Sequence, residues 1–357
     1  MGKRDYSMHG TDAARAVEAG LAAAEWYHTD VPRKEMKALM TRADQPALRD
    51  TALLFAAMIG FAAAGIALWP SWASAPFWLA YGVLYGSAMD SRWHECGHGT
   101  AFKTRWINDA LYQVASFCMM RNPTTWRWSH ARHHTDTIIV GRDPEIAIMR
   151  PPEVLKLALA FIGLRDVAQA IPRMLLNASG RLHPDEATWI PEQEQPKAIR
   201  AARVWVRIYA ATIALALWTG SFLPLMLVGL PRIYGAWHHV LTGFLQHGGL
   251  ADNVIDHRLN SRTVYMNPVS RFIYWNMNYH VEHHMFPMVP YHALPALHEK
   301  IKHDLPAPNR SMPDAWREMW PALRRQMQNE EYFLERALPP TAKPYRLALH
   351  GAPVPAE

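Results

Sequence analysis

The stretch TALLFAAMIGFAAAGIALWPSWASAPFWLAYGVLYGSAM, residues 51–89, contains no Asp, Glu, Lys or Arg. A helix needs about 20 apolar residues to cross the hydrocarbon core of a bilayer, so this stretch is too long for one crossing. Two prolines and several small residues in PSWASAP (70–76) favour a turn near its middle. The stretch therefore predicts a helical hairpin that enters a membrane and returns to the same side. Interior helices of a soluble protein are the alternative, but they do not account for so long a run without charge.

A second apolar stretch covers residues 208–246 and is interrupted by a single charged residue, Arg232. Gly220 and Pro224 mark a break near its middle. We therefore expect a second hairpin over about residues 201–245. The two hairpins together predict an all-α integral membrane protein with about four transmembrane helices.

The charge distribution predicts how the hairpins are oriented. The net charge is +6, and eight Lys and Arg residues lie among the first 50, whereas the two expected outer turns carry none. By the positive-inside rule, the side to which both hairpins return faces the cytoplasm. We expect a protein of the cytoplasmic (inner) membrane. No nucleic-acid partner is expected, because the basic residues form neither a block nor a nucleic-acid motif.

Three histidine clusters lie outside the hairpins: HECGH (94–98), HARHH (130–134) and HVEHH (280–284). Residues three and four apart share one face of an α-helix, so each cluster aims two or three imidazoles at one point. Eight imidazoles are too many for one zinc ion, whose sites take about four ligands. They suit a pair of metal ions, and imidazole alone does not decide among iron, copper, zinc and nickel.

The sequence alone leaves two alternative hypotheses for the histidine clusters. HECGH matches HExxH, the zinc-protease signature in which two histidines bind zinc and the Glu acts as general base. That reading leaves HARHH and HVEHH without a role. A non-catalytic membrane scaffold is the other, but burying so many imidazoles without a ligand would cost free energy.

At these residues the sequence resembles the membrane fatty acid desaturase superfamily, over about residues 50–305. HECGHGTAFKTRWIND, WSHARHHTDT and NYHVEHHMFPMVPYHALPALH are similar to its three histidine boxes in the expected order. LTGFLQHGG is similar to the segment that supplies one further histidine. The resemblance implies two iron ions that activate O2. It implies as their ligands His94, His98, His130, His133, His134, His247, His280, His283 and His284.

The assignment of His247 has competitors. The family often continues this segment with a Thr-His pair, whereas this chain has two glycines at residues 248–249. His238, His239 and His257 are other histidines near this segment. The sequence leaves open whether one of them takes the place of His247.

Groups near the boxes are expected to hold the outer nitrogens of the metal-bound rings, because such a ring usually donates its other N–H to a carboxylate or carbonyl. The candidates are Glu95, Asp136, Asn278 and Glu282. Each of them could equally be a solvated residue on a helix face. Asp143 and Glu145 could pair on the surface with arginines around the second box, namely Arg127, Arg132 and Arg142.

The resemblance also implies the architecture around the site. We expect a cytoplasmic N-terminal segment over residues 1–50, a desaturase-like catalytic domain over 51–305 and a C-terminal cytoplasmic tail over 306–357. A cytoplasmic helical cap would hold the dimetal site. Residues 157–164 predict a short amphipathic helix on the membrane surface, and residues 177–200 predict a loop.

The activity implied is that of an O2-dependent di-iron oxidoreductase that introduces a double bond into a fatty acyl chain of a lipid or thioester. A hydroxylase, or a desaturase of a non-acyl substrate, is the alternative within the same superfamily, because no side chain chooses between these outcomes. The sequence shows neither the HPGG pattern of a fused cytochrome b5 nor a convincing GxGxxG loop. Electrons are therefore expected from an external ferredoxin, rubredoxin or cytochrome b5 with its reductase.

Overall fold

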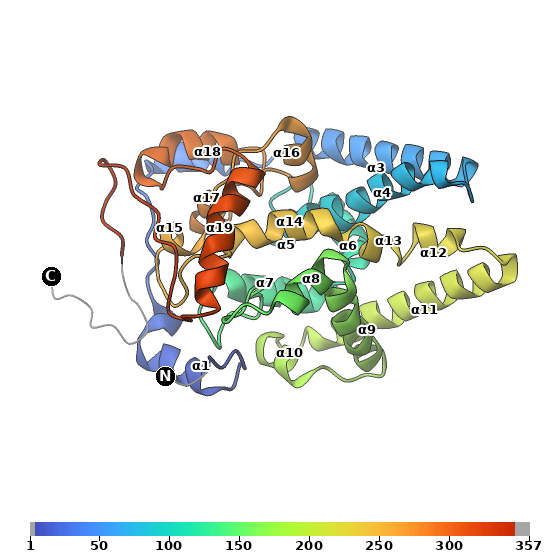
Figure 1. The fold of residues 1–357 in the computed structure, drawn as a ribbon, viewed down its shortest axis with the longest axis horizontal. Helices are drawn as coiled ribbons and strands as arrows, with labels where there is room; N and C mark the ends of the chain where they lie inside the picture. Colours follow the sequence, from blue (N-terminus) through green and yellow to red (C-terminus); the bar gives the residue numbers. More distant parts are fainter. Residues whose placement is uncertain (1–3, 347–357) are drawn as a thin grey trace.

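The computed structural model describes residues 4–346, and its regular elements are helices throughout that range (Figure 1). No β-strand occurs among the described residues, apart from two isolated bridges that join Thr263 to Tyr279 and Val264 to Asn309. The expected all-α class is confirmed. The segment before the first hairpin contains α1 (Thr11–Glu18), η1 (Leu21–Ala23) and α2 (Arg33–Leu39).

The first hairpin consists of α3 (Asp44–Ala67) and α4 (Ala75–Val83), with the short η2 (Trp72–Ser74) in its turn. The turn falls at the two prolines, as the sequence predicts. α4 continues through η3 (Leu84–Ala88), a π-helical turn, into α5 (Met89–His98). The returning arm of the hairpin therefore leads directly into the first histidine cluster. Single π-helical turns inside α-helices are frequent at functional sites.

The second hairpin begins with α11 (Gln195–Thr219), which ends where Gly220 was expected to break it. Its returning arm is divided into α12 (Leu223–Leu227), α13 (Pro231–Tyr234) and α14 (Ala236–His247). The prediction of a loop over residues 177–200 is wrong, because α10 (Pro184–Trp189) and the start of α11 lie there. Proline stands in the first turn of both helices, where its missing N–H is not needed.

The chain between the hairpins forms α6 (Arg105–Met119), α7 (Pro123–Thr135), α8 (Val154–Phe161) and α9 (Leu164–Ala178). The short helix expected over residues 157–164 is α8 as far as residue 161, and α9 begins at residue 164. They are separated at Gly163, whose φ is 66°. A Cβ on Gly163 would lie 2.2 Å from the carbonyl oxygen of Arg232. Glycine therefore allows both the turn and the close packing of α9 against the second hairpin.

After the second hairpin the chain builds the cap of the molecule. Its helices are α15 (His257–Asn260), α16 (Pro268–Tyr274), α17 (His280–Met285), α18 (Leu294–Ile301), η4 (Lys302–Asp304) and α19 (Met312–Gln326). In Figure 1 the turns of both hairpins lie at one end of the molecule, and α1, α15 and α18 lie at the other.

The two hairpins contact each other through glycines. A Cβ on Gly235 would lie 2.0 Å from the carbonyl oxygen of Gly82, and a Cβ on Gly86 would lie 3.3 Å from the Gly235 backbone. Small residues allow helices to approach this closely. The contact brings α4 and η3 against α13 and α14. It therefore brings the first histidine cluster, at the end of α5, close to His247 at the end of α14.

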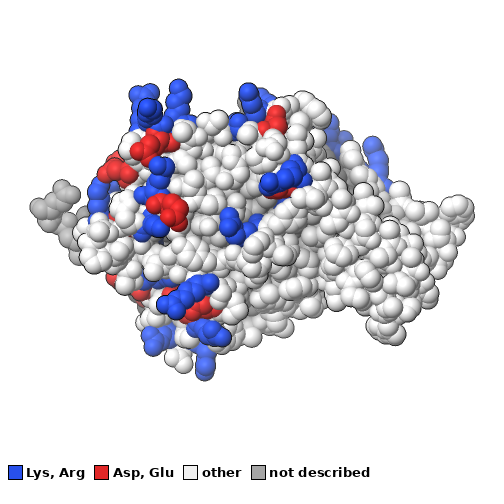
Figure 2. All heavy atoms as spheres, turned by 90° about the horizontal axis from the view of Figure 1, so that it is seen from above, with Lys and Arg blue, Asp and Glu red and all other residues white. Residues whose placement is uncertain are grey.

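The hairpin end of the molecule is apolar on its surface. Figure 2 shows Lys, Arg, Asp and Glu gathered toward the cap, whereas the end formed by the hairpin turns is without charge in this view. Trp72 at the first turn is 92% exposed, and Trp218 near the second is 84% exposed. Among the described residues two helical spans are long and apolar enough to cross a membrane by length and composition: Arg33–Ala67, which includes α3, and Gln195–Thr219, which is α11. The returning arms are shorter or broken.

Candidate metal centre

Nine histidines from four helices converge in two adjacent groups. The first group contains His94, His98, His130, His134 and His283, and the second contains His133, His247, His280 and His284. Within each group the candidate ligand nitrogens all lie within 4.8 Å of one another. These are the nine histidines that the three boxes and the LQHGG segment predict as ligands, and the structure brings all of them together.

The boxes of α7 and α17 each contribute histidines to both groups. α7 gives two to the first group and one to the second, and α17 gives one to the first and two to the second. His130 and His134 of α7 belong to the first group, whereas His133 belongs to the second. In α17 the pair four residues apart (280 and 284) belongs to the second group, and His283 to the first. Residues four apart nearly coincide around a helix, whereas the adjacent histidine is turned by about 100°. One HxxHH box can therefore serve two neighbouring metal ions.

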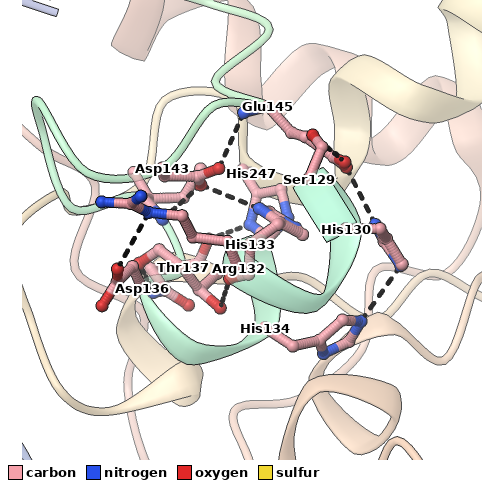
Figure 3. Close-up of polar contacts among 12 residues, drawn as sticks. Ser129, His130, Arg132, His133, His134, Asp136, Thr137, Asp143, Glu145 and His247 are labelled. Atoms are coloured by element: carbon pink, nitrogen blue, oxygen red, sulfur yellow. Dashed lines mark hydrogen bonds and ion pairs between the residues drawn. The ribbon is translucent and has the colours of Figure 1, made fainter. Parts of the chain in front are cut away.

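The outer nitrogens of several rings are held by hydrogen bonds. His130 Nδ1 lies 2.8 Å from Glu145 Oε2, and His133 Nδ1 lies 2.8 Å from Asp143 Oδ2 (Figure 3). His247 Nδ1 lies 2.7 Å from the carbonyl oxygen of Asn260. In each case Nδ1 donates to an oxygen, so Nε2 carries a lone pair that points into the group.

These inward nitrogens face one another at short distances. Neighbouring Nε2 atoms within the two groups lie 3.0–3.2 Å apart, for example 3.1 Å between His280 and His247. Where Nδ1 keeps the proton, two such lone pairs repel each other unless a cation lies between them. Two nitrogens bound at right angles to one ion, each at about 2.1 Å, lie about 3 Å apart. Both ring nitrogens of His94 are also buried without a hydrogen bond. The residues therefore fit a pair of metal ions.

The protonation of the rings agrees with this role. Burial lowers the pKa of seven of them well below the ordinary value, so they are neutral, which is the form that binds metals. These seven are His94, His98, His134, His247, His280, His283 and His284. His133 differs: burial lowers its pKa, but the Asp143 carboxylate outweighs burial and raises it.

Two of the four groups predicted to hold ring nitrogens point away from the histidines. Glu95 is fully buried, and it accepts hydrogen bonds from Thr100 Oγ1 at 2.6 Å and from the Tyr291 backbone N–H at 3.0 Å. Glu282 accepts from Thr263 Oγ1 at 2.5 Å and contacts His298 Nδ1. Glu95 and Glu282 are each next to a histidine of their box in the sequence. Adjacent residues lie on different sides of a helix, so these carboxylates do not point where the histidines point. Because Glu95 does not face the histidines, the zinc-protease reading of HECGH lacks its general base.

The other two predictions are also corrected by the structure. Asp136 pairs with Arg142 Nη2 at 3.0 Å, just beyond the end of α7. Asn278 donates from its side chain to the Val264 carbonyl oxygen at 2.8 Å. The carboxylates that contact imidazoles of the two groups are Asp143 and Glu145, for which the sequence offered arginines as partners.

The loop after α7 explains this exchange of partners. Asp143 Oδ1 accepts the Glu145 backbone N–H at 2.8 Å, and Asp143 Oδ2 accepts that of Ile138 at 2.7 Å. The loop therefore folds back under α7 and places both carboxylates beside the rings (Figure 3). Two acidic residues in GRDPEI, shortly after a histidine box, were a sequence signal for this contact, but the return of the loop is a tertiary feature.

The competitors of His247 lie elsewhere. His238 Nδ1 lies 2.8 Å from Ser87 Oγ, and His239 Nδ1 lies 3.0 Å from Asp90 Oδ2. The ring of His257 stacks on Trp26 with 4.3 Å between the ring centroids. His257 is 5.1 Å from His284 by ring centroids, but it is not part of either group.

Comparison with known proteins agrees with this site. The family model described as "Fatty acid desaturase" matches residues 67–316. This range contains both histidine groups and the returning arms of both hairpins.

Curated plant proteins are similar to the chain at low identity. An sn-2 acyl-lipid omega-3 desaturase (ferredoxin), chloroplastic, of Arabidopsis thaliana is 24% identical over 275 residues, which cover 71% of this chain and 60% of the relative. Fatty acid conjugase FAC2 A of Calendula officinalis is 23% identical over 267 residues, which cover 66% and 71%. An omega-6 fatty acid desaturase of Glycine max is 25% identical over 256 residues, covering 61% and 64%. The chain spans about 60% of the length of the chloroplastic omega-3 relatives.

Proposed function

The chain belongs to the fatty acid desaturase family, and we propose that it is an O2-dependent membrane di-iron enzyme that introduces a double bond into an acyl chain. The observation that carries this proposal is the convergence of nine imidazoles in two adjacent groups, with inward nitrogens 3.0–3.2 Å apart. The relatives are named as desaturases and a conjugase, which supports a desaturase-type reaction.

The first histidine group would hold one iron and the second group the other. Iron suits imidazole ligands, and so do several other transition metals, so family membership favours iron here. When bound, the two irons supply the O2-dependent oxidation of an unactivated C–H bond. The outer nitrogens of His130, His133 and His247 are held by Glu145, Asp143 and the Asn260 carbonyl. These partners orient the rings and raise their basicity.

The balance of the proposed reaction requires an external reductant. Conversion of –CH2–CH2– to –CH=CH– releases two electrons and two protons. Reduction of O2 to two water molecules takes four of each, so a donor must supply two electrons, together with two protons from solvent. We propose a ferredoxin, rubredoxin or cytochrome b5 with its reductase, and the first relative is named for ferredoxin. If a basic cytoplasmic face attracts an acidic donor, raising the salt concentration lowers turnover.

We place the enzyme in the cytoplasmic membrane with four spans in two hairpins. In this topology α3 and α11 cross the membrane away from the cap. The returning arms cross back toward it, the first over residues 75–89 and the second from α12 to about residue 245. The charge-free hairpin end and its exposed tryptophans support this placement. The eight basic residues among the first 50 support a cap on the cytoplasmic side. The catalytic domain would then comprise residues 51–305, with residues 1–50 and 306–357 as cytoplasmic segments.

The test is expression with an electron-transfer system, followed by mass spectrometry of lipids and small metabolites. Loss of two hydrogen atoms from an acyl chain is the expected product, together with two irons per chain by elemental analysis. His280→Ala should abolish the product, whereas His303→Ala, an exposed histidine of the cap, should not. Gain of one oxygen atom would identify a hydroxylase. One zinc per chain, or full activity of His280→Ala, would overturn the proposal.

A further inference from the structure

A cavity of about 530 Å³ opens onto both histidine groups, and its wall combines apolar surface with polar and charged side chains. His94 and His130 of the first group line it, as do His133, His247 and His280 of the second. The remainder of the wall includes polar and charged residues of α5, of α9 and of α14. A bare hydrocarbon tail that filled this cavity would displace water from these groups without returning hydrogen bonds, which costs free energy.

The carboxylate nearest to the first histidine group already has its partners. Asp90 precedes His94 by four residues, so both lie on the same face of α5. Its Oδ1 accepts a hydrogen bond from Arg121 Nη1 at 2.5 Å, and its Oδ2 lies 3.0 Å from His239 Nδ1. Both carboxylate oxygens of Asp90 therefore already contact a nitrogen of the protein.

Arg121, in contrast, keeps donors for a ligand. Its guanidinium lies 4.6 Å from the Trp93 ring and 4.8 Å from the Trp126 ring, which hold it in place. Among the described residues only Nη1 of this side chain is hydrogen-bonded, and Arg121 lines the cavity. The Trp93 ring lies 5.6 Å from the His130 ring by centroids. The Trp93 indole thus contacts both the guanidinium and a ring of the first histidine group.

The next charged residues along the wall show the same difference between a paired carboxylate and an arginine that keeps free donors. Asp166 Oδ2 accepts from Arg232 Nη2 at 2.5 Å, so this carboxylate is paired. Arg173 makes no hydrogen bond with the described residues, and its carboxylate contact, Glu186 Oε1, is 3.9 Å away. The acidic groups are paired while arginine donors remain. The cavity therefore offers guanidinium hydrogen-bond donors, which match carboxylate or phosphate oxygens.

We propose that the substrate is an amphiphile with a carboxylate or phosphate head that binds at Arg121, so that the oxidised carbon lies only a few bonds from the head. Val240 and Phe244 are among the apolar residues of the wall that would contact the adjoining hydrocarbon. This inference rests on the proposed function, because it takes the histidine groups as the reaction centre. Arg121 is thus a substrate-binding residue, and Arg173 assists it from α9.

The test measures binding by titration calorimetry on the purified metal-loaded protein, without reductant. The probes are octanoate, octyl phosphate and 1-octanol, together with phosphatidylglycerol and phosphatidylcholine in nanodiscs. We expect octanoate or octyl phosphate to bind at least tenfold more tightly than 1-octanol. If the head belongs to a membrane lipid, phosphatidylglycerol should be preferred to phosphatidylcholine instead. Either preference for the anion supports the proposal.

Variants connect this preference to the residues. Arg121→Gln should lower the affinity for the anion tenfold or more and so remove the preference. Arg173→Gln should lower the same affinity several-fold. Arg105→Gln is the matched control, because its side chain is 91% exposed on α6. If Arg121→Gln does not fold, Arg173→Gln still tests whether arginines of the cavity wall bind the anionic head.

Equal affinity for octanoate, octyl phosphate and 1-octanol without a lipid preference, or an anion preference that survives in both variants, would overturn the proposal. A different result would contradict the proposed function. In that case the anions bind through Arg121, but reductant and O2 give no oxidised product from any of them or from host lipids.

Discussion

His130 Nδ1 lies 2.8 Å from Glu145 Oε2, across a loop that separates them by 15 residues. The Glu145 carboxylate is buried, and its pKa is lowered: burial alone would raise it, but His130 outweighs burial. Ser129 Oγ donates to the other oxygen of the same carboxylate at 2.8 Å. The carboxylate is therefore held in position to orient the imidazole that precedes it in the chain.

Glu145→Gln should lower iron affinity or turnover by about 10- to 100-fold, because the neutral amide is a weaker partner for the His130 ring. Iron content by elemental analysis and turnover by mass spectrometry measure the effect. Asp136→Asn is the control, since Asp136 pairs with Arg142 and contacts no imidazole of the two groups. Equal losses in the two variants would show that the effect is one of local stability.

Adjacent histidines of the second box should bind different metal ions. His133→Ala should deplete the second site and His134→Ala the first, because α7 turns the two side chains toward different groups. Anomalous diffraction at the iron edge distinguishes the two sites. Loss of the same iron peak in both variants would contradict this division of the box between the two groups.

Gly235→Ala should destabilise the protein by about 1–3 kcal/mol, as overpacking does, because the added methyl group would lie 2.0 Å from the Gly82 carbonyl oxygen. Thermal unfolding in detergent measures the change. Gly60→Ala on α3 is the matched control, because its Cβ would meet no atom within 4 Å. That variant should be neutral or more stable by about 0.5–1 kcal/mol. Equal stability of the two variants would show that the glycine contact between the hairpins is not tight.

Cysteines placed at the two hairpin turns should react from one side of the membrane and a cysteine on the cap from the other. Ser71→Cys and Phe222→Cys should be labelled by an impermeant maleimide on intact spheroplasts, and Arg317→Cys on inverted vesicles. The native Cys96 and Cys118 are buried, so they give little background. Labelling of all three positions from one side would contradict the four-span topology.

Local periodicity made much of the fold and the site predictable. The charge-free run of residues 51–89 predicts the first hairpin, and the structure turns it at the two prolines. The spacing within HARHH and HVEHH predicts convergent imidazoles, and these do converge. Both inferences depend on residues within a few turns of one another, where helical geometry is nearly the same in every protein.

Contacts between distant segments were not predictable in this way. The candidate partners of the ring nitrogens were Glu95, Asp136, Asn278 and Glu282, which make other contacts. A charge pattern lists possible partners for a carboxylate, but it does not say which one the folded loop brings to 2.8 Å. The proline-containing stretch over residues 177–200 was also misread, because proline in a first helical turn looks the same in sequence as proline in a loop.

By itself the sequence determined that apolar hairpins and histidine boxes exist and which imidazoles share a helix face, because 3.6 residues per turn is a local rule. Only the tertiary structure decided that α7 and α17 exchange histidines between two groups and that Asp143 and Glu145 hold the rings. It also decided that charged side chains of α5 and α9 line the cavity beside them. These depend on which surfaces the glycine contact and the returning loop bring together, and that is settled by packing over the whole chain.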